Sequence, residues 1–543
     1  MADDAPIPLA PAEESPAGSP PRLISGPGRR IECSGEIARM IAVFDDGTTL
    51  VSRAHANDMD VNSVLQQARL KGILPRPRFC TMEEIARAVH NAAGEGADAG
   101  TSTMQRELLQ LIAQAAKVRA SDIHVIVGPK KASVRARVFR SMVDLQTSDG
   151  EPIEWAPEYA HRFITAAYNF GDAKTGAHSP SQFQNGQIQN SPEKRMPDTV
   201  ESVRMNFNVL IKQDRHLDIR LFYLDRGAEE RTFASLGFLP QQQALWDEMM
   251  LVPSGVIYVA GKVNSGKSTT LDTAVRKALR ESGHSINIIC FEDPPERVID
   301  GALQFFVIGG TSPEERRAKN IEAMRNALRS DPDMLMIGEV RDKESSELVL
   351  EAALTGKKVL TTTHATDMIT IVPRLAVFHG DAVHDLTDPT VVVGMVGQRL
   401  VQTLCDCKLP YAEADSRNWV ADSVRTNLKR VDVDRSLLFV RNPHGCPHCS
   451  AYVRGVRGQT VIAEMVVPDE VMMRHLREAD TVAARRHWIE GLGGITMRDH
   501  ALIRMIEGTI EPAEYLARLG PMQPLSRRDL MASARIYTPA AAA

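Results

Sequence analysis

Four short apolar runs alternate with helical stretches between Gly255 and Leu400, and this alternation restricts the possible fold more than any other feature of the chain. Short β-branched or apolar runs separated by helices are typical of a parallel α/β sheet. Each run ends in glycine, acidic or histidine residues, and ligands bind outside the carboxyl ends of the strands in such sheets. The sequence therefore predicts one sheet edge that carries the chemistry. The runs are GVIYVAG (255–261), INIICFED (286–293), MLMIGE (334–339) and KVLTTTH (358–364).

The first run leads into a predicted phosphate-binding loop. Residues 261–268, GKVNSGKS, match G-x-x-x-x-G-K-[ST], and the helix predicted after them ends near Gly283. Backbone N–H groups of such a loop and the positive end of the helix surround phosphate oxygens. Lys267 is expected to reach the β- and γ-phosphates of ATP, and the Ser268 hydroxyl to bind Mg²⁺. A glycine- and serine-rich turn that matches by chance is the alternative. The remaining residues expected to contact the nucleotide are Gly261, Asn264, Ser265, Gly266 and Thr269.

Acidic and histidine side chains end the other runs. Glu339 follows an apolar strand, where a carboxylate can orient water or hold the Mg²⁺ shell. A surface glutamate without a catalytic role would fit this position equally well. A second acidic cluster, EDPPE (292–296), suits metal binding and water activation. His364 ends the last run, and a lone histidine in such a place is more often a hydrogen-bonded structural residue.

Length and composition set the size and the setting. A chain of 543 residues is too long for one hydrophobic core, so several domains are expected. The net charge of −5 argues against a surface dedicated to coating nucleic acid. No apolar run reaches the length of about 18 residues that spans a membrane, and the acidic N-terminus does not resemble a secretory signal. The cytoplasm is the expected compartment, with membrane association only through partners.

The regions outside the α/β segment have other patterns. A helix is predicted over 104–118, after a linker at 92–103, and alternating strands at 132–138 and 216–224 predict an antiparallel sheet. The predicted parts are a disordered tail (1–30), a small partner-binding domain (31–91), an α+β domain (104–230), an ATPase domain (235–400), a cysteine module (401–467) and a helical C-terminal domain (468–525).

Several motifs in order resemble the secretion ATPase superfamily, which drives type II secretion, type IV pilus assembly and some type IV secretion or conjugation systems. The resemblance is closest to the pilus assembly and type II branch and covers roughly residues 104–520. The motifs are RASDIHV (119–125), VRARV (134–138), GKVNSGKSTT (261–270), EDPPE (292–296), SDPDMLMIGEVRD (330–342), AALTGKKVLTTTHATD (352–367), QRLVQTLC (398–405) and GGITMRDHALIRMIEGTIEPAEYL (493–516).

The resemblance implies a RecA-like motor domain preceded by a PAS-like α+β domain. It also implies a homo-hexameric ring that works on an inner-membrane platform protein from the cytoplasmic side. Glu296 and Glu339 would activate and position the attacking water, and His364 would sense the γ-phosphate. The arginines that would close over the nucleotide are Arg204, Arg220 and Arg399, although strand arginines also commonly face solvent.

The chain departs from the family at a few places. Lys357 stands where the family often has histidine, and Gln402 and Thr403 stand where it often has two arginines. Four cysteines resemble the family's tetracysteine zinc module, with a CxC where the first pair is normally CxxC. Four thiolates would satisfy a closed structural zinc site, and free reduced thiols are the alternative. These cysteines are Cys405, Cys407, Cys446 and Cys449.

The sequence is also compatible with two functions other than a secretion or pilus motor. One is a type IV secretion or conjugation ATPase, whose relatives often lack the cysteine module. The other is a nucleotide-binding scaffold that does not turn ATP over, which would have no need of Lys267, Ser268, Glu296 and Glu339 together.

Overall fold

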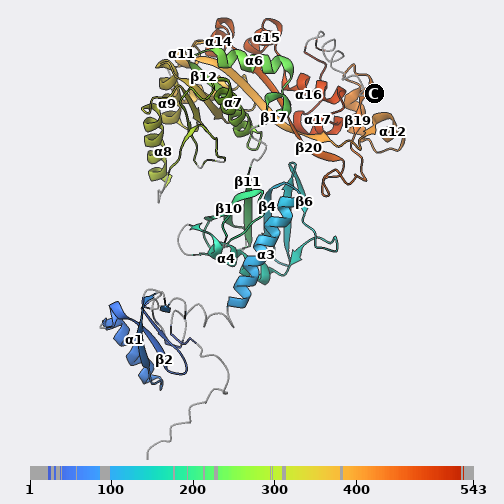
Figure 1. The fold of residues 1–543 in the computed structure, drawn as a ribbon. Helices are drawn as coiled ribbons and strands as arrows, with labels where there is room; N and C mark the ends of the chain where they lie inside the picture. The colour runs from blue at the N-terminus through green and yellow to red at the C-terminus, as the bar shows by residue number, and fades with distance from the viewer. Residues whose placement is uncertain are drawn as a thin grey trace, which may run out of the picture. The chain divides into compact units, whose positions relative to one another are not determined.

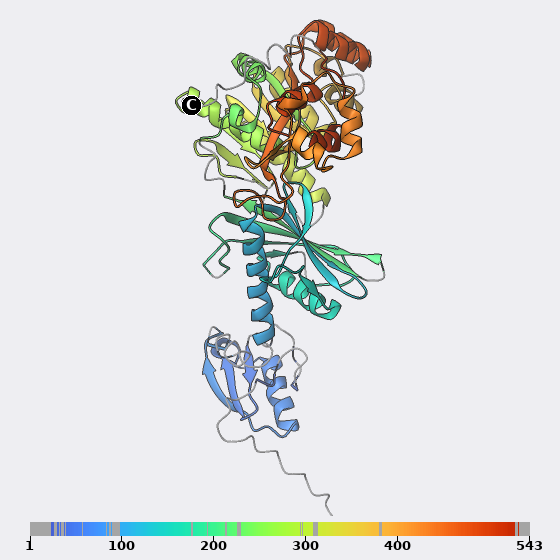
Figure 2. The same cartoon turned by 90° about the vertical axis from the view of Figure 1, so that its right-hand side faces the viewer.

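The computed structural model of the chain describes residues 23–25, 30–31, 33, 37, 40–56, 58–82, 84–85, 88, 98–174, 178–192, 194–211, 214–224, 230–293, 295, 297–307, 313–379, 383–526 and 530. The described residues divide into two compact units, one within Met1–Leu111 and Glu158–Gly171 and the other within Ile112–Pro157 and Asp172–Ala543. Figures 1 and 2 show the chain from two directions. Nearly all of the predicted tail 1–30 lies outside the described residues. Among those residues, no helix combines the length and the apolar character that crossing a membrane requires.

The first unit contains a three-stranded sheet in the order β1-β2-β3. The antiparallel pair β1 and β2 is followed by a parallel pair, β2 and β3, because α1 connects the latter two strands. One face of α1 buries Val61, Val64 and Ala68 against a core with Ile41 and Val43. The elements of this unit are β1 (Ile41–Val43), β2 (Thr48–Ser52), a 3₁₀ turn (Arg53–His55), α1 (Met59–Leu70), β3 (Arg76–Cys80) and α4 (Pro157–Phe170).

Helix α3 (Asp98–Lys117) contains the predicted helix 104–118 and starts earlier than predicted. The second half of the predicted linker 92–103 is therefore helical, and residues 91–97 lie outside the described part of the chain.

The second unit contains an eight-stranded antiparallel sheet, which confirms the antiparallel prediction for 132–138 and 216–224. Its order is β6-β5-β4-β11-β10-β9-β8, and β7 pairs with β5. Buried and partly exposed residues alternate along β4, β5 and β11, as expected for strands with one covered face. The strands are β4 (Ala120–Val127), β5 (Ala132–Val138), β6 (Ser141–Asp144), β7 (Glu154–Trp155), β8 (Ala173–Lys174), β9 (Gln184–Gln189), β10 (Val200–Val209) and β11 (Arg215–Tyr223).

A seven-stranded sheet in the order β14-β13-β15-β16-β12-β17-β20 forms the centre of the same unit. All neighbouring strands are parallel except the edge pair β17 and β20. Four of these strands are the predicted apolar runs, so the predicted parallel sheet is confirmed. The strands are β12 (Gly255–Ala260), β13 (Ile288–Phe291), β14 (Leu303–Phe305), β15 (Met334–Ile337), β16 (Lys358–Thr363), β17 (Val392–Leu404) and β20 (Val456–Val466).

Helices cover both faces of this sheet (Figure 1). Along β12, Val256, Tyr258 and Ala260 enter one hydrophobic core, and Ile257 and Val259 enter the other. Helices α8, α9, α10, α14 and α15 complete the first core, while α6 and α7 complete the second. A strand buried on both faces reads as a continuous apolar run, which explains the pattern of the sequence.

The C-terminal part of the unit is helical from Glu470 to Leu519, within the range 468–525 that was predicted to be helical. Each of its first three helices begins at a side-chain cap, which Asp469, Asp480 and Thr496 provide. The helices of the whole unit are α5 (Phe233–Leu236), α6 (Pro240–Leu251), α7 (Lys267–Glu281), α8 (Pro313–Leu328), α9 (Lys343–Leu354), α10 (Ile371–His379), α11 (Val383–Leu386), α12 (Tyr411–Ser416), α13 (Asp422–Leu428), α14 (Glu470–Arg477), α15 (Thr481–Glu490), α16 (Met497–Ile506) and α17 (Pro512–Leu519). Two short strands, β18 (Leu409–Pro410) and β19 (Phe439–Val440), pair beside them.

Candidate active site

The loop 261–268 connects β12 to α7 at the carboxyl edge of the sheet. Its path requires glycine at two positions. Gly266, immediately before α7, has a φ of +87°, and a Cβ on Gly261 would lie 2.3 Å from the Ser265 hydroxyl and 2.6 Å from the Gln398 carbonyl. Asn264 also has a positive φ, of +61°. The chain therefore turns tightly between β12 and α7, as the backbone of a phosphate-binding loop does.

Lys267, His364 and Glu339 form a continuous line of contacts across three strand ends. Lys267 Nζ donates to the Gly261 carbonyl at 2.9 Å. His364 Nδ1 lies 3.4 Å from the same carbonyl oxygen, and its Nε2 lies 2.7 Å from Glu339 Oε1. Both ring nitrogens thus face oxygens that only accept, so a ring with a single proton satisfies one of the two contacts. The structure brings these three predicted residues together.

Glu339 is held from its other side as well. Arg341 Nε donates to Glu339 Oε2 at 2.8 Å, and Arg341 itself is largely exposed. Glu339 follows β15, and Asp342 then begins α9 in a capping box with Ser345. The Glu339 carboxylate therefore lies between a histidine and an arginine, with Oε1 on the side of His364 and Oε2 on the side of Arg341. Arg341 was not singled out in the sequence, where it reads as an ordinary surface arginine.

The second acidic cluster begins at the neighbouring strand end. Glu292 approaches the strand of Glu339, since a Cβ on Gly338 would lie 3.3 Å from Glu292 Cγ. Asp293 accepts from Arg316 at 3.0 and 2.8 Å. Burial alone would raise the pKa of Asp293, but the hydrogen bonds from Arg316 and Asn320 outweigh it and lower that pKa. Glu296, the predicted catalytic residue of this cluster, lies outside the described residues.

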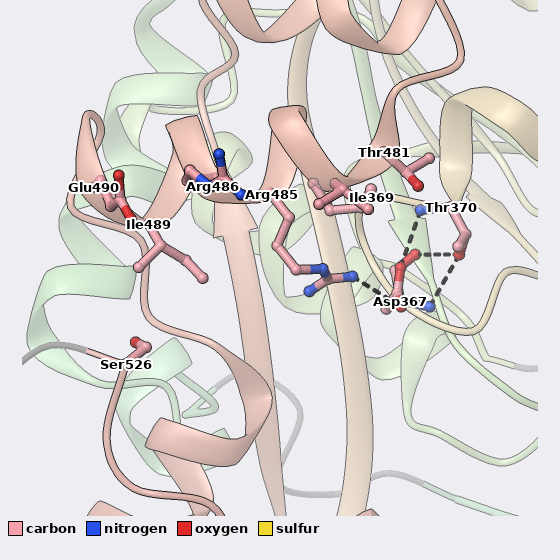
Figure 3. A pocket seen from close by; sticks show the side chains of 10 residues that line it. Asp367, Ile369, Thr370, Thr481, Arg485, Arg486, Ile489, Glu490 and Ser526 are labelled. Atoms are coloured by element: carbon pink, nitrogen blue, oxygen red, sulfur yellow. Dashed lines mark hydrogen bonds and ion pairs between the residues drawn. The ribbon is translucent and has the colours of Figure 1, made fainter.

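The loop borders a hollow of about 450 Å³, which is lined by Gly261, Lys262, Val263, His364, Ala365, Thr366, Thr370 and Arg374. A second hollow of about 570 Å³ is lined in part by Asp367, Ile369 and Thr370, which follow His364 in the chain (Figure 3). There Arg485 of α15 donates to Asp367 at 3.1 Å, and Asp367 accepts from the Thr370 backbone at 3.0 Å. These bonds fix the segment 365–370, and through it the position of His364 on the first hollow.

The remaining predicted loop residues have definite surroundings. The Ser265 hydroxyl is buried without a hydrogen-bond partner in the described structure, and Ser268 is half-buried in the first turn of α7. The Thr269 hydroxyl accepts from Arg297 Nη2 at 3.1 Å. The buried Ser265 hydroxyl, which has no hydrogen-bond partner in the described structure, fits a loop that binds a polar ligand such as a phosphate.

Gln398 of β17 holds the phosphate loop from behind. Its Nε2 donates to the Ser265 carbonyl at 3.0 Å, and its Oε1 accepts from the Thr270 hydroxyl at 3.0 Å. The side chain is fully buried, so these two bonds replace contacts that water would otherwise make. The family resemblance pointed instead to the neighbouring Arg399, whose guanidinium can neutralise phosphate charge.

Replacing Gln398 by leucine is expected to lower the free energy of unfolding by about 1–3 kcal/mol, because the Ser265 carbonyl and the Thr270 hydroxyl lose their partners. Nucleotide affinity is expected to fall as well, since the loop loses its support. Chemical denaturation and equilibrium nucleotide binding measure the two effects. Thr403→Val, on the same strand, is the matched control. Unchanged nucleotide affinity in Gln398→Leu would contradict the supporting role.

The predicted arginines occupy two different places. Arg204 and Arg220 face each other on β10 and β11. Arg220 Nε donates to the buried carboxylate of Asp122 at 3.0 Å, and Arg204 lies over the Phe222 ring at 5.5 Å. Both therefore lie on the antiparallel sheet, against partners of that sheet. Arg399 instead follows Gln398 and donates to the carbonyls of Arg518 and Thr366 at 2.7 and 3.4 Å.

The four cysteines gather at one end of the antiparallel pair β17 and β20. Cys405 and Cys407 follow β17, and Cys446 and Cys449 precede β20. All four sulfur atoms lie within 4.8 Å of one another, and the Cys405 and Cys446 sulfurs are 3.6 Å apart. A tetrahedral zinc–thiolate site places its sulfurs about 3.8 Å apart. The Cys405 amide donates to the Gly455 carbonyl at 2.9 Å, which extends the antiparallel pairing as far as the first cysteine of the CxC pair.

The cysteine sulfurs are also hydrogen-bonded as metal ligands usually are. The Cys446 amide donates to Cys449 Sγ at 2.9 Å. Backbone hydrogen bonding, first from His448, lowers the pKa of the Cys446 thiol to about 7. The group fits a closed four-thiolate metal site in its donor set, its spacing and its surroundings.

Residues 97–517 match the family model described as Type II/IV secretion system protein. Type II secretion system ATPase E of Vibrio cholerae serotype O1 is 32% identical over 267 residues, which are 49% of this chain and 48% of that protein. Type II secretion system protein HxcR of Pseudomonas aeruginosa is 28% identical over 409 residues, which are 73% of this chain and 72% of that protein. The chain spans about half the length of the first of these relatives.

The fold is similar to that of a solved structure. The X-ray structure of the Legionella pneumophila ATPase DotB matches with a TM-score of 0.50 at 18% identity, over 76% of this chain and 95% of that chain. At this identity the likeness concerns the fold, and it confirms the predicted fold class of a parallel α/β domain preceded by an α+β domain.

Proposed function

The chain belongs to the Type II/IV secretion system protein family, and from that membership we propose that it is an ATP-hydrolysing motor that powers protein secretion or pilus assembly. The observation that carries this proposal is the line of contacts at the sheet edge. Lys267 and His364 meet on the Gly261 carbonyl, and His364 reaches the Glu339 carboxylate. A phosphate-binding lysine, a histidine and an oriented carboxylate are thus within contact of one another.

The chemistry divides among these groups. Lys267 and the loop amides bind the β- and γ-phosphates, and Ser268 holds the magnesium ion, whose charge offsets that of the phosphates. Glu339, oriented by Arg341 and His364, positions the attacking water together with Glu296. His364, on the border of the hollow beside the loop, responds to the γ-phosphate.

We further propose that the motor is a homo-hexamer, in which Arg204, Arg220 and Arg399 act as nucleotide-closing arginines. It would act in the cytoplasm, peripheral to the inner membrane, on a platform protein of the secretion or pilus machine. Family membership supports these assignments, and the relatives above are named as type II secretion proteins. The cysteine cluster favours the type II and pilus branch over a conjugation ATPase.

Purified protein is expected to release phosphate from ATP only with Mg²⁺, and its specific activity is expected to rise with protein concentration, since shared sites in an oligomer form by mass action. A phosphate-release assay at several protein concentrations, run beside size measurement in solution, tests this. ATP binding without turnover at every concentration would instead support the scaffold function.

We propose that the cysteine cluster holds a structural zinc ion. Chelator-washed, folded protein is expected to retain about one zinc per chain, because four thiolates form a closed site. Cys446→Ser is expected to lose that zinc and to lower the melting temperature, whereas Cys33→Ala retains it. Metal analysis and thermal melting measure both effects, and folded wild-type protein without zinc would contradict the assignment.

A further inference from the structure

The turn between β5 and β6 has an unusual backbone for its residues. Phe139 and Arg140 form the turn, with φ values of +46° and +71°. Two-residue hairpin turns with both φ values positive favour Asn-Gly or Asp-Gly, because side chains with a Cβ are strained there. The chain therefore keeps two large side chains at a place where small residues would make a more stable turn.

The turn is held by a buried side chain of the seven-stranded sheet, within the same compact unit. Gln402 Nε2 donates to the Phe139 carbonyl at 2.6 Å and to the Ser141 hydroxyl at 3.0 Å. The Gln402 side chain is itself fixed, because its Oε1 accepts from Arg441 Nη2 at 3.2 Å. Gln402 is one of the positions at which the chain departs from the family pattern. Its amide both donates and accepts here, which an arginine cannot do.

This docking brings Arg140 to the phosphate loop. Arg140 Nη1 donates to the Asn264 carbonyl at 3.0 Å, and Asn264 stands at the outer bend of the loop with its own positive φ. Among the described residues, no carboxylate forms an ion pair with Arg140. Its charge is therefore available for an anion on the loop.

Positive charge exceeds negative charge around this contact. Arg399 and Arg518 lie close to Arg140, and Glu514, which accepts from Arg518 at 2.8 Å, is the carboxylate among them. Burial, and next the charge of Arg518, lowers the pKa of Arg140. Arg399 Nε is buried without a hydrogen-bond partner in the described structure. Guanidinium groups gathered without matching carboxylates are stabilised by an anion, and a triphosphate is the anion that the neighbouring loop is built to bind.

We propose that Arg140 is a further positioning residue of the nucleotide site, which acts within its own chain by holding the phosphate loop at Asn264 and adding positive charge beside the nucleotide's phosphates. This inference rests on the proposed function and adds a residue that is distinct from Arg204 and Arg220. It also gives a reason for the strained turn, because the turn places the Arg140 guanidinium on the phosphate loop.

The test uses the full chain and two turn variants. Phe139→Asn with Arg140→Gly creates the favoured turn, and Arg140→Gln removes the charge alone. The double variant is expected to raise the melting temperature and yet to weaken binding of a fluorescent ATP analogue with Mg²⁺ about tenfold, because one charged hydrogen bond is lost. Arg140→Gln is expected to weaken binding similarly, and Arg140→Lys to recover part of it. In turnover, KM is expected to rise more than kcat falls.

A matched control removes a charge elsewhere on the same hairpin. Arg135→Gln, whose partner is Asp144 of β6, is expected to bind the analogue as wild type does. Wild-type affinity in both Arg140→Gln and the double variant would overturn the role of Arg140 and leave the proposed function intact. A wild-type chain that binds no ATP would overturn both.

Discussion

Replacing Lys267 by alanine is expected to reduce kcat/KM for ATP hydrolysis by about 100- to 1000-fold, the usual cost of removing one group that stabilises developing charge. The lysine already lies inside the loop, with its ammonium on the Gly261 carbonyl, so the variant removes the positive charge closest to the phosphates. Phosphate release with Mg²⁺ measures the loss. Lys319→Ala on α8 is a matched control, because Lys319 is a partly exposed lysine outside the loop that pairs at 3.8 Å with Glu315.

Folding must be checked beside activity, because Lys267 is buried. Circular dichroism and thermal melting are expected to show a folded variant, since the main loop supports from Gln398 remain. Substantial hydrolysis by a folded Lys267→Ala protein would rule out this loop as the catalytic nucleotide site.

Glu339→Gln is expected to keep ATP binding and to lower turnover by about 100- to 10,000-fold, the range for removing a general base. The amide has the same shape as the carboxylate, but it cannot accept a proton from water. It also cannot keep both contacts with His364 and Arg341 as an acceptor. Equilibrium binding and single-turnover hydrolysis separate the two effects.

Glu347→Gln on α9 is the control for a change from glutamate to glutamine, because Glu347 is exposed and pairs at 3.6 Å with Lys343. A Glu339→Gln protein with wild-type turnover would move the catalytic role to another carboxylate, with Glu296 as the next to substitute.

The central sheet was predictable because its strands are buried on both faces. β12, β13, β15 and β16 lie within the four predicted runs, and α7 ends at Glu281, close to the predicted stop at Gly283. Parallel order places their carboxyl ends at one edge, so Lys267, Glu339 and His364 could be grouped from the sequence before any distance was known. The resemblance to the secretion ATPases is confirmed by the family model over residues 97–517.

Other features depend on partners that lie far away in the chain. Gln398 bonds to a loop more than a hundred residues earlier, and no local pattern distinguishes it from any other polar residue of a strand. The contact between Arg140 and the Asn264 carbonyl could not be predicted either, because it forms only where the β5–β6 turn meets the phosphate loop. The helical start of α3 at Asp98 was missed since its first residues are small and glycine-containing, which lowers helix propensity. The roles of Arg204, Arg220 and Arg399 stay predictions.

Strand β17 has a mechanical consequence. Gln398 near its middle holds the phosphate loop, and Cys405 just past its end belongs to the cysteine cluster. At about 3.3 Å per residue, the two points are roughly 23 Å apart along one stiff rod. Strand β20 pairs with β17 from Met395 to Leu404, and this antiparallel pairing stiffens β17 against bending. A change in the position of the cysteine cluster is therefore expected to reach the phosphate loop through the backbone of β17.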